Sequence, residues 1–294
     1  SPPLLQDGYN PGGAVPEGTT IEQFLQNFSP LTNEQVIAAD TAMNAWAEVA
    51  NITFNRIDNE TAELVGDIRF GRSIQVNDGR TASAFYPSNH PTAGDIWFSS
   101  QDNDGKAAFN INVDNGSITS KGTYAYATFL LEIGHALGLK HPHEDGVIAN
   151  LNIDTTAYSV MSYRSYVGHP VDDGYQQNFY PTTPMINDIA AIQYLYGKNM
   201  NTRNGNTIYS WKPNEQIFET IWDAGGTDTI DWSNQNSDAK IDLSVNKLGE
   251  EVKWSELGQG YNNGIATENK NLAIAYDIEI ENANQLILFH SSFF

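Results

Sequence analysis

The segment from Leu131 to His141, with the sequence LEIGHALGLKH, constrains this chain more than any other. Residues four apart on a helix share a face, so a helix here directs positions 131 and 135 the same way. Gly138 permits the left-handed backbone conformation that ends a helix and turns the chain. The pattern therefore predicts that His141 returns to the same side as His135.

This segment matches the extended zinc-protease signature H-E-x-x-H-x-x-G-x-x-H at every fixed position except the first. Leu131 stands where the signature has its first metal-binding histidine. Glu132, His135, Gly138 and His141 occupy the remaining positions. The spacing is specific enough to indicate a metalloprotease site that lacks one ligand.

A second motif lies downstream, where Tyr158 to Tyr163 read YSVMSY. This run resembles the Met-turn of the metzincin clan in its serralysin form. The resemblance extends to five further segments, at residues 47–54, 67–71, 184–193, 195–197 and 222–229. It covers most of residues 30 to 283, and the chain is identified as a member of the serralysin family of metzincin zinc metalloproteases, peptidase family M10.

The resemblance implies an α+β fold in which a metzincin catalytic domain has a twisted sheet, an active-site helix and the Met-turn. A β-rich C-terminal domain follows, similar to the start of the serralysin β-roll or sandwich. After Gly197 the sequence changes to short strands with Asn-Gly and Gly-Gly turns, which indicates a boundary. We expect a metalloprotease domain at residues 1–197 and a β-rich calcium-binding domain without nonapeptide repeats at residues 198–294.

The resemblance also implies roles for the active-site residues. Zinc would be held by His135, His141 and Tyr163, and Glu132 would act as general base toward a zinc-activated water. Tyr163 is either a zinc ligand or a donor to the oxyanion of the tetrahedral intermediate. Met161 lies beneath the metal in that family, so Met161 and Gly138 have structural roles.

Leu131 offers no donor atom and fills the space of the missing ligand. Removing a group that merely orients a metal ligand costs roughly 10- to 100-fold in affinity or activity, so losing a ligand should cost at least as much. We expect zinc to be weakly bound or absent and proteolysis to be slight or absent. Whether Leu131 is natural or introduced stays open.

Two other functions also stay open. The chain could be a natural pseudoprotease that binds peptides or a proteinaceous inhibitor, or a secreted structural or adhesive protein stabilised by calcium. We do not expect another histidine to replace the missing ligand, because Pro142 stiffens the chain before His143. His90, His169 and His290 are expected on the surface or in loops.

In serralysins the first turns of the C-terminal domain bind calcium, which prefers carboxylate and backbone carbonyl oxygens. The matching positions here are Arg203, Gly205, Thr207, Asp223, Gly225, Gly226 and Asp228, with Glu279 and Glu281 as ligands of another ion. The family continues into repeats of the type G-G-x-G-x-D, but this chain departs from the pattern after Ala283. A lost β-roll, a fragment and a different C-terminal cap all agree with that departure.

Local signals predict several elements of the first domain. Thr32 and Gln35 form a capping box before a helix with an apolar stripe at Val36, Ala39, Met43, Trp46 and Ala50. Short β-type runs are expected at residues 52–57, 67–72, 81–86 and 95–99. Asp102 to Gly105 is interpreted as a turn rather than a calcium loop, and Asn115-Gly116 as a hairpin turn.

The strand from Thr81 to Tyr86 matches the family's strand at the edge of the cleft. A peptide or protein substrate could pair with that edge as an extra antiparallel strand, although an ordinary edge strand is the alternative. The 36 acidic and 15 basic residues give a net charge of −21, which argues against nucleic acid or an anionic membrane as a partner.

The sequence contains no cysteine, so neither a disulfide framework nor a thiol nucleophile is available. No apolar stretch is long enough to span a membrane. Ser1 to Asp7 lacks the basic start and apolar centre of a signal peptide. Serralysins are exported by a route that reads the C-terminus, so the resemblance implies a secreted, extracellular protein, which we expect to be a monomer.

Overall fold

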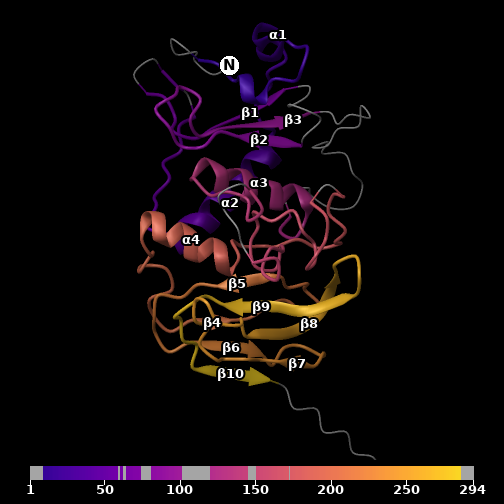
Figure 1. Ribbon diagram of the computed structural model, residues 1–294. Coiled ribbons are helices and arrows are strands. Elements are labelled where there is room, and N and C mark those ends of the chain that lie inside the picture. The colour runs from indigo at the N-terminus through magenta and orange to yellow at the C-terminus, as the bar shows by residue number, and fades with distance from the viewer. Residues whose placement is uncertain are drawn as a thin grey trace, which may run out of the picture. The chain divides into compact units, whose positions relative to one another are not determined.

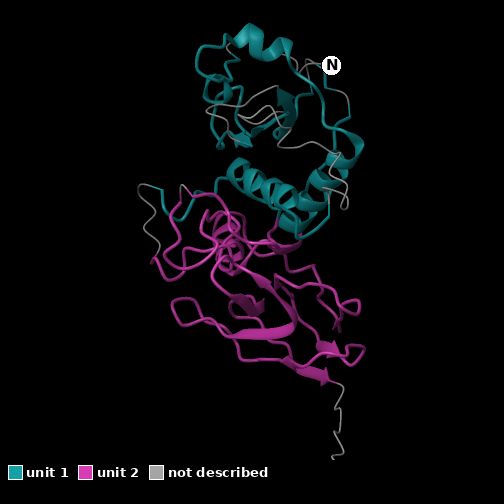
Figure 2. Ribbon diagram, turned by 90° about the vertical axis from the view of Figure 1, so that its right-hand side faces the viewer, with its two compact units in different colours: residues 1–47, 52–149 teal, residues 48–51, 150–294 magenta. Residues whose placement is uncertain are grey.

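The computed structural model describes residues 9–58, 60–61, 64–73, 81–100, 120–144, 150–171 and 173–285. Helices and sheets occur together, which confirms the α+β class (Figure 1). Figure 2 shows two compact units, the first made of residues 1–47 and 52–149, the second of residues 48–51 and 150–294. None of the described helices is long and apolar enough to cross a membrane.

The partition into units differs from the division expected after Gly197, because the Met-turn segment and the helix after it belong to unit 2. As a division into functional domains, the boundary at residue 198 stays a prediction. The expected turn at Asp102 to Gly105 and the hairpin turn at Asn115-Gly116 lie outside the described residues.

Unit 1 contains a sheet of three described strands in the order β1-β3-β2. Strand β1 (Arg69–Ser73) pairs in parallel with β3 (Asp95–Ser99), and β2 (Ala82–Ala84) pairs antiparallel with β3. All five residues of β3 are buried, as expected for a central strand. Strand β2 stands at one end of this order, where the sequence predicts an edge.

The expected strand at residues 52–57 is wrong, since the chain there forms no strand. Backbone pairing occurs instead just before this run. Ala50 forms an isolated bridge with Lys198, and Asn51 N–H donates to Gly197 O at 2.9 Å. A run of β-type residues becomes a strand only when another strand offers its backbone groups. No described strand does so for residues 52–57.

The segment before residue 33 packs on the sheet of unit 1. It contains helix α1 (Ile21–Gln26), which begins with a capping box between Thr20 and Gln23. Phe24 from this helix contacts Trp97 of β3, with ring centroids 4.8 Å apart. The Gly and Pro content of the segment did not indicate this helix.

Two longer helices carry the core of unit 1. Helix α2 (Asn33–Val49) begins at the predicted capping box, where Thr32 N–H donates to Gln35 Oε1 at 2.9 Å and Gln35 N–H to Thr32 Oγ1 at 3.3 Å. Trp46 of α2 is fully buried and donates its indole N–H to Leu130 O at 3.1 Å. This bond joins α2 to helix α3 (Tyr124–Ala136), which packs against β2 and β3.

Unit 2 contains helix α4 (Ile186–Tyr196), and the part of the chain after this helix is β-rich, as predicted. Its strands are β4 (Ile208–Tyr209), β5 (Glu219–Ile221), β6 (Thr229–Trp232), β7 (Ala239–Lys240), β8 (Trp254–Asn262), β9 (Thr267–Ile274) and β10 (Asn282–Gln285). They form two sheets in the orders β10-β6-β4 and β5-β9-β8-β7. A shared core includes Trp232, Leu257 and Leu272.

Asp188 joins the Met-turn segment to α4. Its carboxylate accepts hydrogen bonds from the Ser159 hydroxyl at 2.6 Å, Val160 N–H at 2.7 Å and Met185 N–H at 2.8 Å. Asp188 is 2 % exposed, so these donors replace the water that the carboxylate would otherwise bind. The first turn of α4 and residues 159–160 are therefore fixed to one another by a single side chain.

We expect Asp188→Ala to lower the free energy of unfolding by at least about 2 kcal/mol, because buried N–H and O–H donors would lose their acceptor. Chemical denaturation measures this loss. Asp173→Ala, which removes an exposed loop carboxylate of the same unit, is the matched control and should change stability by less than about 0.5 kcal/mol. Equal stability of the two variants would contradict the proposed role of Asp188.

Burial raises the pKa of Asp188 to about 6, although its three donors act in the opposite direction. An unfolded aspartate has a pKa of about 3.9, so between about pH 4 and 6 the folded state binds more protons than the unfolded state. Stability should then decrease as pH rises through this window, and Asp188→Asn should flatten the pH dependence of the melting temperature. Asp95, whose pKa burial also raises to about 6, should leave a residual slope. Unchanged slopes in the variant would disprove the linkage.

Candidate functional site

Helix α3 ends in the turn that the sequence predicts. Gly138 has a φ of 104°, a conformation that residues with a Cβ rarely adopt. Gly138 N–H donates to His135 O at 2.8 Å, and Leu139 N–H donates to Gly134 O at 2.9 Å. These two bonds form a Schellman motif, which satisfies the last carbonyls of the helix and reverses the chain.

The turn brings His135 and His141 together. Their Nε2 atoms are 3.1 Å apart, and the two rings meet edge to face with centroids 4.4 Å apart. Two nitrogens bound to one tetrahedral zinc at about 2.0–2.1 Å would lie roughly 3.3 Å apart. The separation is therefore close to what two ligands of one zinc ion need.

Hydrogen bonding and burial favour the neutral, metal-binding form of His135. Its Nδ1 lies 2.8 Å from Leu139 O, so Nδ1 carries the proton and Nε2 presents a lone pair. Burial lowers the pKa of His135, and the Leu139 carbonyl offsets this effect only in part. His135 is 7 % exposed and His141 8 %, so both rings are shielded from solvent.

The third ligand position is apolar. Leu131 lies on α3 one turn before His135 and is 6 % exposed. Among the described residues, no group of three or more His, Cys, Asp or Glu side chains is arranged to hold a metal ion. Catalytic zinc sites have three protein ligands, so the residues present fit two of the three. Glu132, the expected general base, is buried on the same helix at 6 % exposure.

Tyr86 and Glu144 also lie at this site. The sequence predicted Tyr86 only as the end of the edge strand at the cleft, and it did not single out Glu144. The Tyr86 ring meets the His135 ring edge to face at 5.4 Å, and its hydroxyl donates to Glu144 Oε2 at 3.2 Å. The same oxygen accepts His141 N–H at 3.3 Å. Burial, together with the negative charges of Glu144 and Glu132, raises the pKa of Tyr86 to about 12. Glu144 follows His141 by three residues, and this spacing was the available signal.

The remaining histidines take different positions. The His143 ring stacks on His141 with centroids 5.1 Å apart. His90 is exposed, as expected, and its Nδ1 lies 2.8 Å from Thr92 Oγ1. His169 lies in a loop but is fully buried, with its ring 4.7 Å from that of Tyr166. His290 is outside the described residues.

Met161 and Tyr163 belong to unit 2, so their roles at the metal stay predictions. Met161 is 1 % exposed, and its N–H donates to Ser159 Oγ at 3.0 Å. Because Ser159 is also bonded to Asp188, the Met-turn is held in place by α4. The Tyr163 ring meets that of Tyr175 edge to face at 6.2 Å.

The structure brings together several residues of the expected calcium turns. Asp223 and Asp228 are almost completely buried, at 1 % and 0 % exposure. Asp228 Oδ1 accepts Thr207 N–H at 2.7 Å, and Asp223 Oδ1 accepts Gly225 N–H at 2.7 Å. Asp228 N–H donates to Glu281 Oε2 at 2.7 Å, so Glu281 belongs to this cluster.

The backbone around these carboxylates is tightly folded. Gly226 has a φ of 148°, and a Cβ there would lie 2.7 Å from Gly205 O. Arg203 adopts a φ of 50° and donates from its guanidinium to Trp222 O at 3.2 Å. Glu279 is exposed, and its charge contributes to the raised pKa of Lys247.

Among the described residues, the carboxylate of Asp228 is hydrogen-bonded through only one of its two oxygens. Its Oδ2 is buried without a hydrogen-bond partner in the described part of the chain. Burial raises the pKa of Asp228, and the negative charges of Asp223 and Glu281 raise it further. An unpaired carboxylate oxygen beside other carboxylates is costly to bury unless a cation or proton compensates it.

Comparison with known proteins finds a family match for each half of the chain. The peptidase M10 family described as Matrixin matches residues 20–163, and the peptidase M10 serralysin C-terminal family matches residues 188–285. Two proteins of Dickeya chrysanthemi, serralysin B and a serralysin C, are each 32 % identical to it, over 281 and 302 residues. These alignments cover 87 % and 92 % of this chain and 52 % and 54 % of the two relatives.

Metalloprotease AprA of Pseudomonas entomophila is 31 % identical over 291 residues, covering 88 % of this chain and 53 % of AprA. The chain thus spans about half the length of these relatives. Its matrixin region contains the paired histidines, and its serralysin C-terminal region contains the buried carboxylates. The chain therefore belongs to peptidase family M10, in the serralysin family of metalloproteases.

Proposed function

We propose that this chain is a serralysin-like zinc metalloendopeptidase domain whose peptidase activity is strongly impaired by Leu131. The observation that carries this proposal is the convergence of two imidazole nitrogens at 3.1 Å beside an apolar residue in the third position. Two well-placed histidines support weak zinc binding completed by water or Tyr163. They fall one ligand short of a catalytic site.

Zinc, when bound, supplies an activated water and polarises the peptide carbonyl. His135 and His141 would hold the ion, and Glu132 would take the proton of the attacking water. Tyr163 would bind the metal or donate to the oxyanion, as the family resemblance implies. Leu131 contributes none of these functions, and its side chain occupies the space in which a ligand nitrogen is needed.

The substrate class follows from the family, whose members act on peptides or proteins. Strand β2, which pairs with β3 at one end of the described sheet order, supports binding of an extended peptide along its open edge. The same edge would serve a pseudoprotease that holds a peptide or a proteinaceous inhibitor without cleaving it, and this is our second candidate. A purely structural or adhesive role is the third. Secretion as an extracellular monomer fits the proposed protease.

Leu131→His should raise zinc affinity by at least about 10- to 100-fold and restore hydrolysis of a broad-specificity peptide substrate, because it completes the three-histidine set. Metal analysis of the purified protein and a peptidase assay measure the two effects, with calcium present. Leu131→Gln, which introduces a polar side chain that is a poor zinc ligand, is the matched control. It should show neither higher zinc affinity nor peptide hydrolysis.

A double variant, Leu131→His with Glu132→Gln, separates zinc binding from catalysis. It should bind zinc but remain inactive, because the general base is absent. If Leu131→His folds, remains zinc-free and does not cleave, the impaired-protease proposal is wrong and the binding-module candidate gains support.

We also propose that Asp223, Asp228 and the adjoining turns bind calcium. The buried, unpaired Oδ2 of Asp228 supports this, since a hard cation would bind that oxygen. Side-chain carboxylates alone would not complete the shell, so backbone carbonyls of the turns, such as that of Gly205, would supply further ligands. Glu279 and Glu281 are proposed at another ion, which would lie next to this one because Glu281 accepts Asp228 N–H.

The calcium proposal predicts that the effect of Asp228→Asn on the melting temperature differs between calcium and chelator. With calcium present, Asp228→Asn should lower the melting temperature, because a ligand charge is lost. Under chelation it should leave the melting temperature equal or raise it, because the variant removes a buried charge close to Asp223 and Glu281. Asp231→Asn on β6 is the control and should keep the calcium response of the unaltered chain. If the melting temperature of the unaltered chain is the same with and without calcium, the site does not exist.

A further inference from the structure

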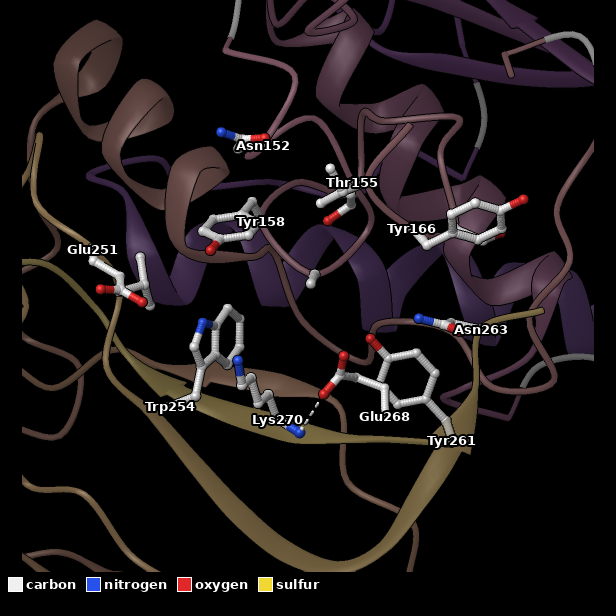
Figure 3. Close-up of a pocket in the computed structure, with 14 residues that line it drawn as sticks. Asn152, Thr155, Tyr158, Tyr166, Glu251, Trp254, Tyr261, Asn263, Glu268 and Lys270 are labelled. Carbon is white, nitrogen blue, oxygen red and sulfur yellow. Dashed lines mark hydrogen bonds between the residues drawn. The ribbon is translucent and has the colours of Figure 1, made fainter. Parts of the chain in front are cut away.

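Unit 2 contains a cavity of about 170 Å³ that none of the preceding functions uses. Its walls come from the segment 152–167 on one side and from β8 and β9 with the loop before β8 on the other (Figure 3). An engineered cavity of about 150 Å³ is large enough for benzene. This cavity is therefore the size of one long side chain or a small molecule, not of a cofactor.

Aromatic rings form much of the wall. Tyr158 and Trp254 meet edge to face with centroids 5.6 Å apart, and Tyr166 and Tyr261 line other sides. Trp254 is 8 % exposed and Tyr261 2 %, so packing fixes both rings in place. The faces of Trp and Tyr rings attract organic cations, most strongly where water is excluded.

The charged residues of the lining favour the same kind of ligand. Glu251, Glu268 and Lys270 give the cavity a formal charge of −1. Glu268 Oε1 accepts the backbone N–H of Lys270 at 3.0 Å, as drawn in Figure 3, and this bond fixes the carboxylate at the cavity. Within the described part of the chain, neither glutamate forms an ion pair with a cationic side chain. One monovalent cation would neutralise the lining.

Tyr261 is the nearest labelled aromatic residue to Glu268 in the cavity (Figure 3). Burial raises the pKa of this phenol, and the negative charge of Glu268 raises it further. Figure 3 shows the carboxylate of Glu268 beside the Tyr261 ring, and Glu268 is half-buried. A neutral donor and an anionic acceptor are available side by side for a ligand with several N–H groups.

We propose that this cavity binds the side chain of an arginine or lysine from a basic peptide, with the guanidinium or ammonium group at Glu268 and its aliphatic stem against Trp254. The net charge of −21 on the chain attracts such a peptide over a longer range. The proposal does not depend on zinc, on Leu131 or on catalysis, because every lining residue belongs to unit 2.

The test uses the full chain and two probes of equal shape. N-acetyl-arginine amide carries the guanidinium cation, and N-acetyl-citrulline amide replaces it with a neutral urea. Ligand-detected NMR titration measures both. Glu268→Gln removes the carboxylate at the proposed cation position, whereas Glu250→Gln removes the same charge from a residue that does not line the cavity.

We expect the arginine probe to bind with a millimolar dissociation constant and the citrulline probe at least about tenfold more weakly. Glu268→Gln should weaken binding of the arginine probe about 5- to 10-fold, and Glu250→Gln less than about twofold. Circular dichroism verifies that each variant is folded.

Three results would overturn the proposal. Equal binding of the two probes would mean that charge is not recognised. An equal loss of affinity in Glu250→Gln and Glu268→Gln would assign the binding to the general acidity of the chain. No binding of the arginine probe at about 50 mM would leave the cavity without this ligand, and binding of a neutral monosaccharide in its place would assign it to carbohydrate.

Discussion

The left-handed turn at Gly138 is the constraint on which the candidate metal site depends. Its φ of 104° ends α3 and reverses the chain within three residues, so that His141 Nε2 reaches His135 Nε2. A residue with a Cβ would strain this backbone, and a shift of a few tenths of an ångström would separate the two nitrogens. The helix in turn fixes position 131 one turn before His135. Backbone geometry thus determines where a third ligand would have to be.

A hydrogen bond between the two rings can hold the histidine pair when no metal is bound. Because His135 Nδ1 donates to Leu139 O, the neutral His135 ring offers its Nε2 lone pair, and His141 Nε2–H can donate to it. A bound cation would have to displace that hydrogen bond. With a third imidazole, three metal–nitrogen bonds would replace one hydrogen bond. With Leu131 only two would replace it, so less binding free energy is gained.

The two buried aspartates of unit 2 show how the same chemical group can have different roles. Asp188 has three donors from the chain itself, so its burial serves to join the Met-turn to α4. Asp228 has an Oδ2 that no described group satisfies, and Asp223 lies close to it. Buried carboxylates satisfied by the chain act as structural links, whereas an unsatisfied one needs a proton or a cation to compensate it.

The sequence by itself determined the features that depend on neighbouring residues. These are the capping box at Thr32 and Gln35, the strand at residues 95–99, the end of α3 at Gly138 and the missing donor at Leu131, because helix periodicity, caps and turns are set within a few residues. Tertiary structure decided the rest. Residues 52–57 form no strand because no described strand pairs with them, and Tyr86 joins Glu144 across 58 residues. The cavity likewise needs side chains from distant segments, whose packing no local pattern specifies.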